Sequence, residues 1–79
     1  MLQPKILRVE PLTDYQLRLW YETGEIKIFN VRPYISGNWF KELENQDYFR
    51  TVHLVGQGIE WGNGQDIAPH ELYEMSLPG

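Results

Sequence analysis

The chain has 79 residues, 42% of them hydrophobic, and a formal charge of −4 from eleven acidic and seven basic side chains. This length predicts one domain spanning residues 1–79 with a single small core. The absence of cysteine excludes disulfides and thiolate zinc sites. The basic residues form no stripe along the chain, so direct nucleic-acid binding is not favoured. No segment reaches the roughly 20 apolar residues of a membrane span, and we expect a cytoplasmic protein.

The first half of the chain predicts three antiparallel strands. Residues 5–12 carry β-prone side chains up to Pro11, which favours an edge position. Residues 15–22 alternate strictly, with Leu17 and Leu19 on one side and Trp20 on the other. Thr23-Gly24 has the spacing of a tight hairpin turn, which leads into a third strand over residues 25–31.

Strand phase in this hairpin predicts apolar side chains on both faces. In the third strand, Phe29 and Val31 are out of phase with Ile26 and Ile28. We expect Phe29 and Val31 to share the wetter face with Trp20, either under a helix or as a protein contact. Trp39 is a fourth candidate for this interaction surface.

The middle of the chain predicts short helical segments followed by a second hairpin. A helix over residues 39–44 would present Trp39, Phe40 and Leu43 on one apolar face. Asp47 is expected to cap a further helical turn that reaches residue 50. Residues 51–55 predict a fourth strand, and the glycine-rich residues 56–58 turn the chain into a fifth strand that carries a buried Trp61.

The C-terminal segment predicts a turn followed by a helix. Asn63 and Gly64 belong to a glycine-rich turn that tolerates positive φ angles. Asp66 is expected to cap the helix that follows, and Pro69 suits its first position. Leu72 and Tyr73 would return this helix to the sheet, and residues 76–79 are expected to fray.

These residues form the pattern W-x-N-G-x-D-x-x-P-x-x-L-Y, made by Trp61, Asn63, Gly64, Asp66, Pro69, Leu72 and Tyr73. Together with the upstream strands, the pattern resembles a bacterial family of small domains of unknown function, number 2442. The resemblance implies small accessory proteins, sometimes encoded beside a small partner as in toxin and antitoxin pairs. It also implies that some members carry a helix-turn-helix segment. No such segment follows the pattern here, so we expect no direct operator binding.

The expected fold is α+β, with a small, mostly antiparallel sheet of about five strands and two short helices in the order β-β-β-α-β-β-α. Hairpin connections dominate, and strands do not alternate with crossover helices. This pattern argues against a doubly wound sheet.

Residues able to carry chemistry are few and lack the usual neighbours. His70-Glu71 begins like the helical zinc motif H-E-x-x-H, but the second histidine is missing. His53 has no nucleophile in a recognisable context, and helix capping explains Asp66 more simply than catalysis does. We therefore predict no catalytic, cofactor-binding or metal-binding residue and no cofactor.

The sequence favours a non-enzymatic protein-interaction module, such as an accessory or antitoxin-like partner of a small neighbouring protein, or a self-associating chain. A first alternative is a component of a nucleic-acid-linked transcriptional regulator. It would need a basic face assembled in the fold from Lys5, Arg8, Arg18, Lys27, Arg32, Lys41 and Arg50. A second alternative is a small-ligand binder or an enzyme in which His53, Asp66 and His70 converge in a pocket.

Overall fold

The structure is a computed structural model that describes residues 3–35 and 40–79. The strands in these residues are β1 (Ile6–Leu12), β2 (Gln16–Tyr21), β3 (Ile26–Asn30), β4 (His53–Val55), β5 (Gly58–Glu60), β6 (Asp66–Ile67) and β7 (Leu77–Pro78). The helices are α2 (Gln46–Phe49) and α3 (Pro69–Met75), with 3-10 turns η1 (Thr13–Tyr15), η2 (Arg32–Tyr34) and η3 (Lys41–Glu44). None of these helices has the length and apolar character that a bilayer crossing requires.

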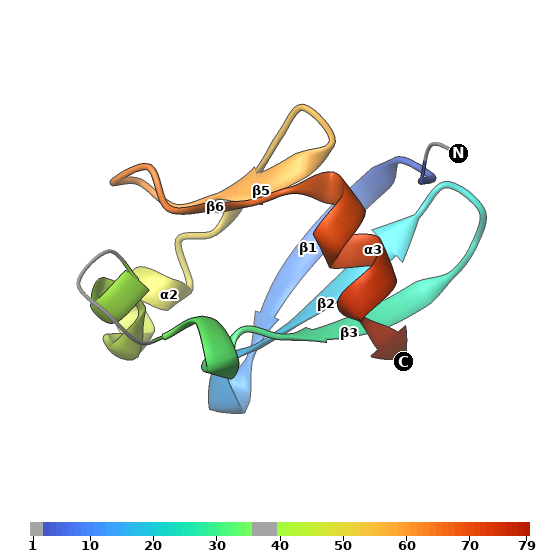
Figure 1. Ribbon diagram of the computed structural model, residues 1–79. Helices are drawn as coiled ribbons and strands as arrows, with labels where there is room; N and C mark the ends of the chain where they lie inside the picture. The colour runs from blue at the N-terminus through green and yellow to red at the C-terminus, as the bar shows by residue number, and fades with distance from the viewer. Residues whose placement is uncertain (1–2, 36–39) are drawn as a thin grey trace.

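The strands form two antiparallel sheets, which confirms the α+β class and corrects the prediction of one five-stranded sheet (Figure 1). The first sheet has the order β1-β2-β3-β7, and the second has the order β4-β5-β6. The single sheet was wrong because, among the described residues, no strand of β1, β2 and β3 pairs with β4 or β5. Two short strands that were not foreseen, β7 and β6, extend the two sheets separately, at β3 and at β5.

The loop between β2 and β3 sets which side chains face the core. The Tyr21 N–H donates to the Glu25 carbonyl, and Gly24 takes a φ of 92°, so three residues form the loop. Leu17 therefore lies opposite Phe29, and Trp20 lies opposite Ile26. The predicted two-residue turn would have shifted this register by one position. Such a shift moves every side chain of β3 to the other face.

Phe29 and Val31 are accordingly buried, and the prediction that they share a face with Trp20 is wrong. They lie on the inner face of the first sheet with Leu17 and Leu19. Trp20 shares the opposite face with Ile26 instead.

The C-terminal residues are part of the sheet, although the sequence predicted a frayed tail. Leu77 pairs with Ile28, and the Gly79 N–H donates to the Ile26 carbonyl at 2.9 Å. Pairing of a two-residue strand is possible because Ser76 ends α3 in an extended conformation and aims the chain along β3.

In place of the predicted helix over residues 39–44, Lys41–Glu44 form a 3-10 turn, η3, and Leu43 is its buried residue. Trp39 lies outside the described residues. Asn45 rather than Asp47 caps α2, because its side-chain oxygen accepts from the backbone N–H groups of Asp47 and Tyr48.

The segment after Trp61 is a tight hairpin between β5 and β6, and this overturns the capping role of Asp66. Gly64 takes a φ of 96°, and Glu60 pairs with Asp66, which lies in β6. The residue at the N-cap of α3 is Ala68, and no side chain caps this helix. Pro69 at the start of α3 is confirmed, since that position needs no N–H.

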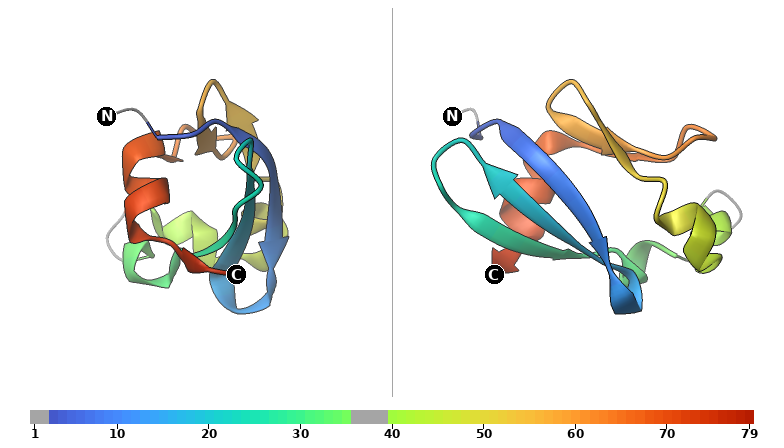
Figure 2. Two further views of the ribbon diagram at one scale, coloured as in Figure 1. Left: turned by 90° about the vertical axis from the view of Figure 1, so that its right-hand side faces the viewer. Right: turned by 180° about the vertical axis from the view of Figure 1, so that it is seen from behind.

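The core lies between the inner face of the first sheet, the second sheet and α3 (Figures 1 and 2). Trp61 is fully buried, as predicted, and its Nε1–H donates to the Phe49 carbonyl at 2.8 Å. The buried hydrophobic residues are Ile6, Leu17, Leu19, Tyr21, Phe29, Val31, Leu43, Phe49, Ile59, Trp61, Ile67 and Leu72.

Candidate interaction surface

The outer face of the first sheet is the surface that points away from this core. Residues directly opposite each other in an antiparallel ladder point to the same side, so the register defines its rows. Arg8, Trp20 and Ile26 form the first row across β1, β2 and β3. Glu10, Arg18, Ile28 and Leu77 form the second row, which continues into β7. Leu12, Gln16 and Asn30 form a third row on the same side, next to η1. The seven residues of the first two rows are called the outer face below.

The outer face is graded from charged to apolar across the sheet. Arg8 and Glu10 occupy the β1 end, whereas Ile26, Ile28 and Leu77 occupy the β3 and β7 end. Ile26 is 41% exposed and Leu77 is 70% exposed. The right view of Figure 2 looks onto this face, with α3 behind the strands. No helix of the described chain lies in front of it.

Trp20 is held at the centre of the outer face by two arginines. The guanidinium carbons of Arg8 and Arg18 lie 4.6 and 5.8 Å from its ring centroid. Glu10 orients both arginines, at 3.1 Å from Arg18 and 4.0 Å from Arg8. Cation–π contacts and ion pairs together fix a large aromatic ring at the surface. A fixed ring loses little conformational entropy when it makes a contact.

The sequence identified one residue of this surface and missed the others. Trp20 was predicted from its strand phase. Phe29 and Val31 belong to the core, and Trp39 is outside the described residues. The apolar residues of this surface are instead Ile26, Ile28 and Leu77. A three-residue hairpin loop, in place of the predicted two-residue turn, would have placed Ile26 and Ile28 on the same face as Trp20.

The turn residues of the sequence pattern serve the fold through a polar network. The Asn63 and Gln65 side-chain amides donate to the two carboxylate oxygens of Glu42, at 2.6 and 2.9 Å. The Tyr48 hydroxyl donates to Gln65 at 2.6 Å and accepts from the Asn63 N–H. The hydrogen bond from Asn63, followed by that from Gln65, lowers the pKa of Glu42. The network ties the β5–β6 turn to η3 and α2.

A second polar group attaches α3 to the first sheet. The Tyr73 hydroxyl donates to Glu25, and Lys27 Nζ donates to the Tyr73 carbonyl at 3.0 Å. A further hydrogen bond joins η2 to α3, because the Tyr34 hydroxyl donates to Glu71. Desolvation, and then the bond to Glu71, raises the pKa of Tyr34 to about 12. These groups are paired with one another and explain why Tyr73 belongs to the sequence pattern.

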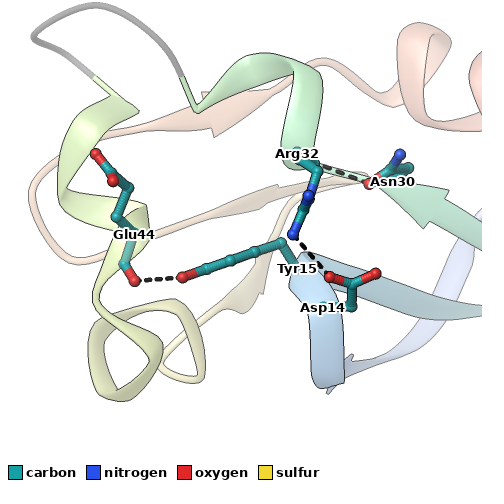
Figure 3. A network of polar contacts seen from close by, with 5 residues as sticks. All are labelled: Asp14, Tyr15, Asn30, Arg32 and Glu44. Atoms are coloured by element: carbon teal, nitrogen blue, oxygen red, sulfur yellow. Dashed lines mark hydrogen bonds and ion pairs between the residues drawn. The ribbon is translucent and has the colours of Figure 1, made fainter.

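A hollow of about 260 Å³ lies at the opposite end of the first sheet, lined by Tyr15, Arg32, Ile35 and Glu44. Figure 3 shows the polar contacts around it. Arg32 pairs with Asp14 at 2.9 Å, and the Tyr15 hydroxyl donates to the Glu44 carbonyl at 2.5 Å. Asp14 and Tyr15 both have positive φ angles, of 63° and 59°. The turn thus serves contacts that join η1 to η2 and η3, and Figure 3 shows that Asp14, Tyr15, Asn30 and Arg32 are engaged in these contacts.

The three residues of the alternative pocket hypothesis do not form a cluster. His53 and Asp66 lie on the two outer strands of the second sheet with Glu60 between them. His70 Nε2 pairs with Glu74 at 2.8 Å along α3. Within residues 3–35 and 40–79, no group of three histidine or carboxylate side chains is arranged to hold a metal ion.

The basic residues are also spread over different parts of the structure. Arg8 and Arg18 are on the outer face beside Glu10, while Lys27 contacts α3 and Arg32 pairs with Asp14 at the far end. The basic face that a nucleic-acid-linked regulator would need is not assembled from these four.

The comparison with known proteins supports a family but no activity. The family model described as protein of unknown function DUF2442 matches residues 6–77, and the chain belongs to this family. No curated protein and no solved structure matches the chain. The match covers both sheets and α3, so the outer face lies within the family domain.

Proposed function

We propose that this member of the DUF2442 family is a non-enzymatic module that binds a protein partner through the outer face. An accessory or antitoxin-like role beside another small protein is the form of this function that we favour. The observation that carries the proposal is the open apolar half of the sheet, where Ile26 and Leu77 stay exposed beside Trp20.

The composition of the outer face supports binding rather than folding. Tryptophan and arginine are the residues most enriched among those that dominate binding energy at protein interfaces. Here one tryptophan and two arginines lie together, beside aliphatic side chains that gain free energy when a partner removes them from water. Contiguous apolar patches of this kind on a small protein commonly mark association sites.

Site-specific photocrosslinking tests the proposal directly. A benzophenone amino acid in place of Ile26 should form covalent adducts with the partner in the native host, because position 26 is in the apolar half of the outer face. Val55 is the matched control, since it is an exposed aliphatic residue, at 49%, on β4 of the other sheet. We expect adducts from position 26 in at least about tenfold excess over position 55.

Either a second copy of this chain or a different protein in the adduct supports the proposal. Equal adduct yields from positions 26 and 55 would contradict it, as would the absence of adducts from position 26. Circular dichroism of both labelled proteins checks that each is folded.

A further inference from the structure

We propose that the partner on the outer face is a second copy of this chain, packed face to face about a twofold axis. This inference rests on the proposed function and names the partner. The axis lies between the two faces, runs across the strands, and passes between the first and second rows of the outer face. The strands of the two copies are then antiparallel across the interface, as in an aligned sandwich of two sheets.

This axis brings the first row of one copy over the second row of the other. Arg8 then faces the partner's Glu10, and Glu10 faces the partner's Arg8, so both charge pairs are attractive. Trp20 faces the partner's Arg18, which can contact the ring in the way that Arg18 already does within one copy. Ile26 faces the partner's Ile28. Each row therefore meets side chains of complementary chemistry.

The gradient across the sheet favours this axis over the other in-plane twofold. An axis parallel to the strands would place the charged β1 of one copy over the apolar β3 and β7 of the other. That arrangement would desolvate Arg8 and Glu10 against aliphatic side chains, which is costly. The axis across the strands keeps β1 over β1 and β3 over β3. Of the two axes, only the one across the strands places charged side chains over charged ones and apolar side chains over apolar ones.

The size of the face predicts a weak dimer. Four strands about 4.8 Å apart and five residues long, at about 3.4 Å per residue, give a flat area of about 300 Å² per copy. This area is well below the roughly 800 Å² per partner of a standard stable interface. We therefore expect half-association at about 0.1 to 1 mM, and a steep dependence of dimer on protein concentration.

A charge-swap experiment tests both the partner and the axis. Sedimentation equilibrium of the wild type should show the mass rising from 9.4 kDa toward twice that value with increasing concentration. Arg8→Glu alone and Glu10→Arg alone should each weaken association by about tenfold or more, because like charges then face each other across the axis. In an equimolar mixture, the carboxylate introduced at position 8 faces the guanidinium introduced at position 10. The mixture should recover association to within about threefold of the wild type.

The control is the pair Lys41→Glu and Glu60→Arg, which changes charge on η3 and β5 and should leave association unchanged in either variant. Recovery in the mixture supports the inference. A wild type that stays monomeric at about 1 mM overturns it, as does a mixture no better than either variant alone. If the wild type is monomeric but position 26 cross-links to a different protein, the proposed function survives and only the second copy is rejected.

Discussion

Adjacent residues on β2, Leu19 and Trp20, show how differently the two faces of one sheet are used. Leu19 is fully buried in the core, whereas Trp20 lies on the outer face between two arginines. The inner face is closed by elements of the same chain. On the outer face, cation–π contacts and ion pairs join Trp20, the two arginines and Glu10, and Ile26 and Leu77 are exposed. We propose that the inner face supplies most of the folding free energy and that the outer face binds a partner.

The largest loss of stability should come from the centre of the core. Trp61→Ala removes a fully buried ring and its hydrogen bond to the Phe49 carbonyl. We expect a loss of about 3 to 5 kcal/mol in the free energy of unfolding. A domain of this size has a total of roughly 5 kcal/mol, so most of the protein should be unfolded. Chemical denaturation followed by circular dichroism measures this, and a midpoint near that of the wild type would contradict the packing.

The paired variants Leu19→Ala and Trp20→Ala separate the two faces of β2. Leu19→Ala should cost about 2 to 5 kcal/mol, because its side chain is fully buried. Trp20→Ala should cost only about 1 to 2 kcal/mol, because the half-buried ring makes two cation–π contacts worth roughly 0.5 to 1 kcal/mol each. Denaturant titrations of both variants compare these losses. Equal losses would mean that the outer face is as important for folding as the inner face.

Tyr21 is the polar exception on the inner face. Its hydroxyl is buried and has no hydrogen-bond partner among the described residues. Tyr21→Phe should therefore leave the unfolding free energy unchanged or raise it by up to about 1 kcal/mol. A loss of more than about 1 kcal/mol in a thermal or chemical unfolding curve would reveal a bond that this structure lacks.

Tyr21 also predicts that the free energy of unfolding falls at alkaline pH. Burial, with smaller contributions from Tyr73 and Glu25, raises the pKa of Tyr21 to about 12 from 10.0. A raised pKa in the folded state means that the stabilisation is complete below pH 10 and is lost as the pH rises toward 12. Tyr21→Phe should flatten part of this decline, and Tyr34, whose pKa is also about 12, should account for a remaining part. Unfolding curves measured at several pH values between these limits test the assignment.

The smallest effect is expected at Asp66, which is exposed in β6 rather than at a helix cap. Asp66→Ala should change the unfolding free energy by no more than about 0.5 kcal/mol, as for surface positions in general. A loss of about 1 kcal/mol or more would restore the capping role that the structure rejects.

Local patterns in the sequence predicted β1, β2 and β3 of the first sheet well. Strict alternation located β2 and its buried face, and Pro69 marked the start of α3. These signals depend only on neighbouring residues, and the dominance of hairpin connections indicated the overall α+β class.

The errors arose where a short segment is determined by distant contacts. β7 is two residues long and exists because Leu77 meets Ile28, to which no periodicity points. Asp66 precedes Pro69 as a capping residue would, but Glu60 holds it in a strand. One residue in the β2–β3 loop reversed the face of β3, so the predicted surface contained Phe29 and Val31 in place of Ile26 and Ile28.

The most direct test of the account compares Ile26→Asp with Val55→Asp in affinity for the partner that cross-links from position 26. Both residues are exposed aliphatic strand residues, but only Ile26 is on the outer face. Each variant should lose no more than about 1 kcal/mol of stability, the full span of strand propensities. We predict that Ile26→Asp weakens binding by about tenfold or more and that Val55→Asp leaves it unchanged. Wild-type affinity in a folded Ile26→Asp variant would contradict the assignment of the outer face as the binding surface.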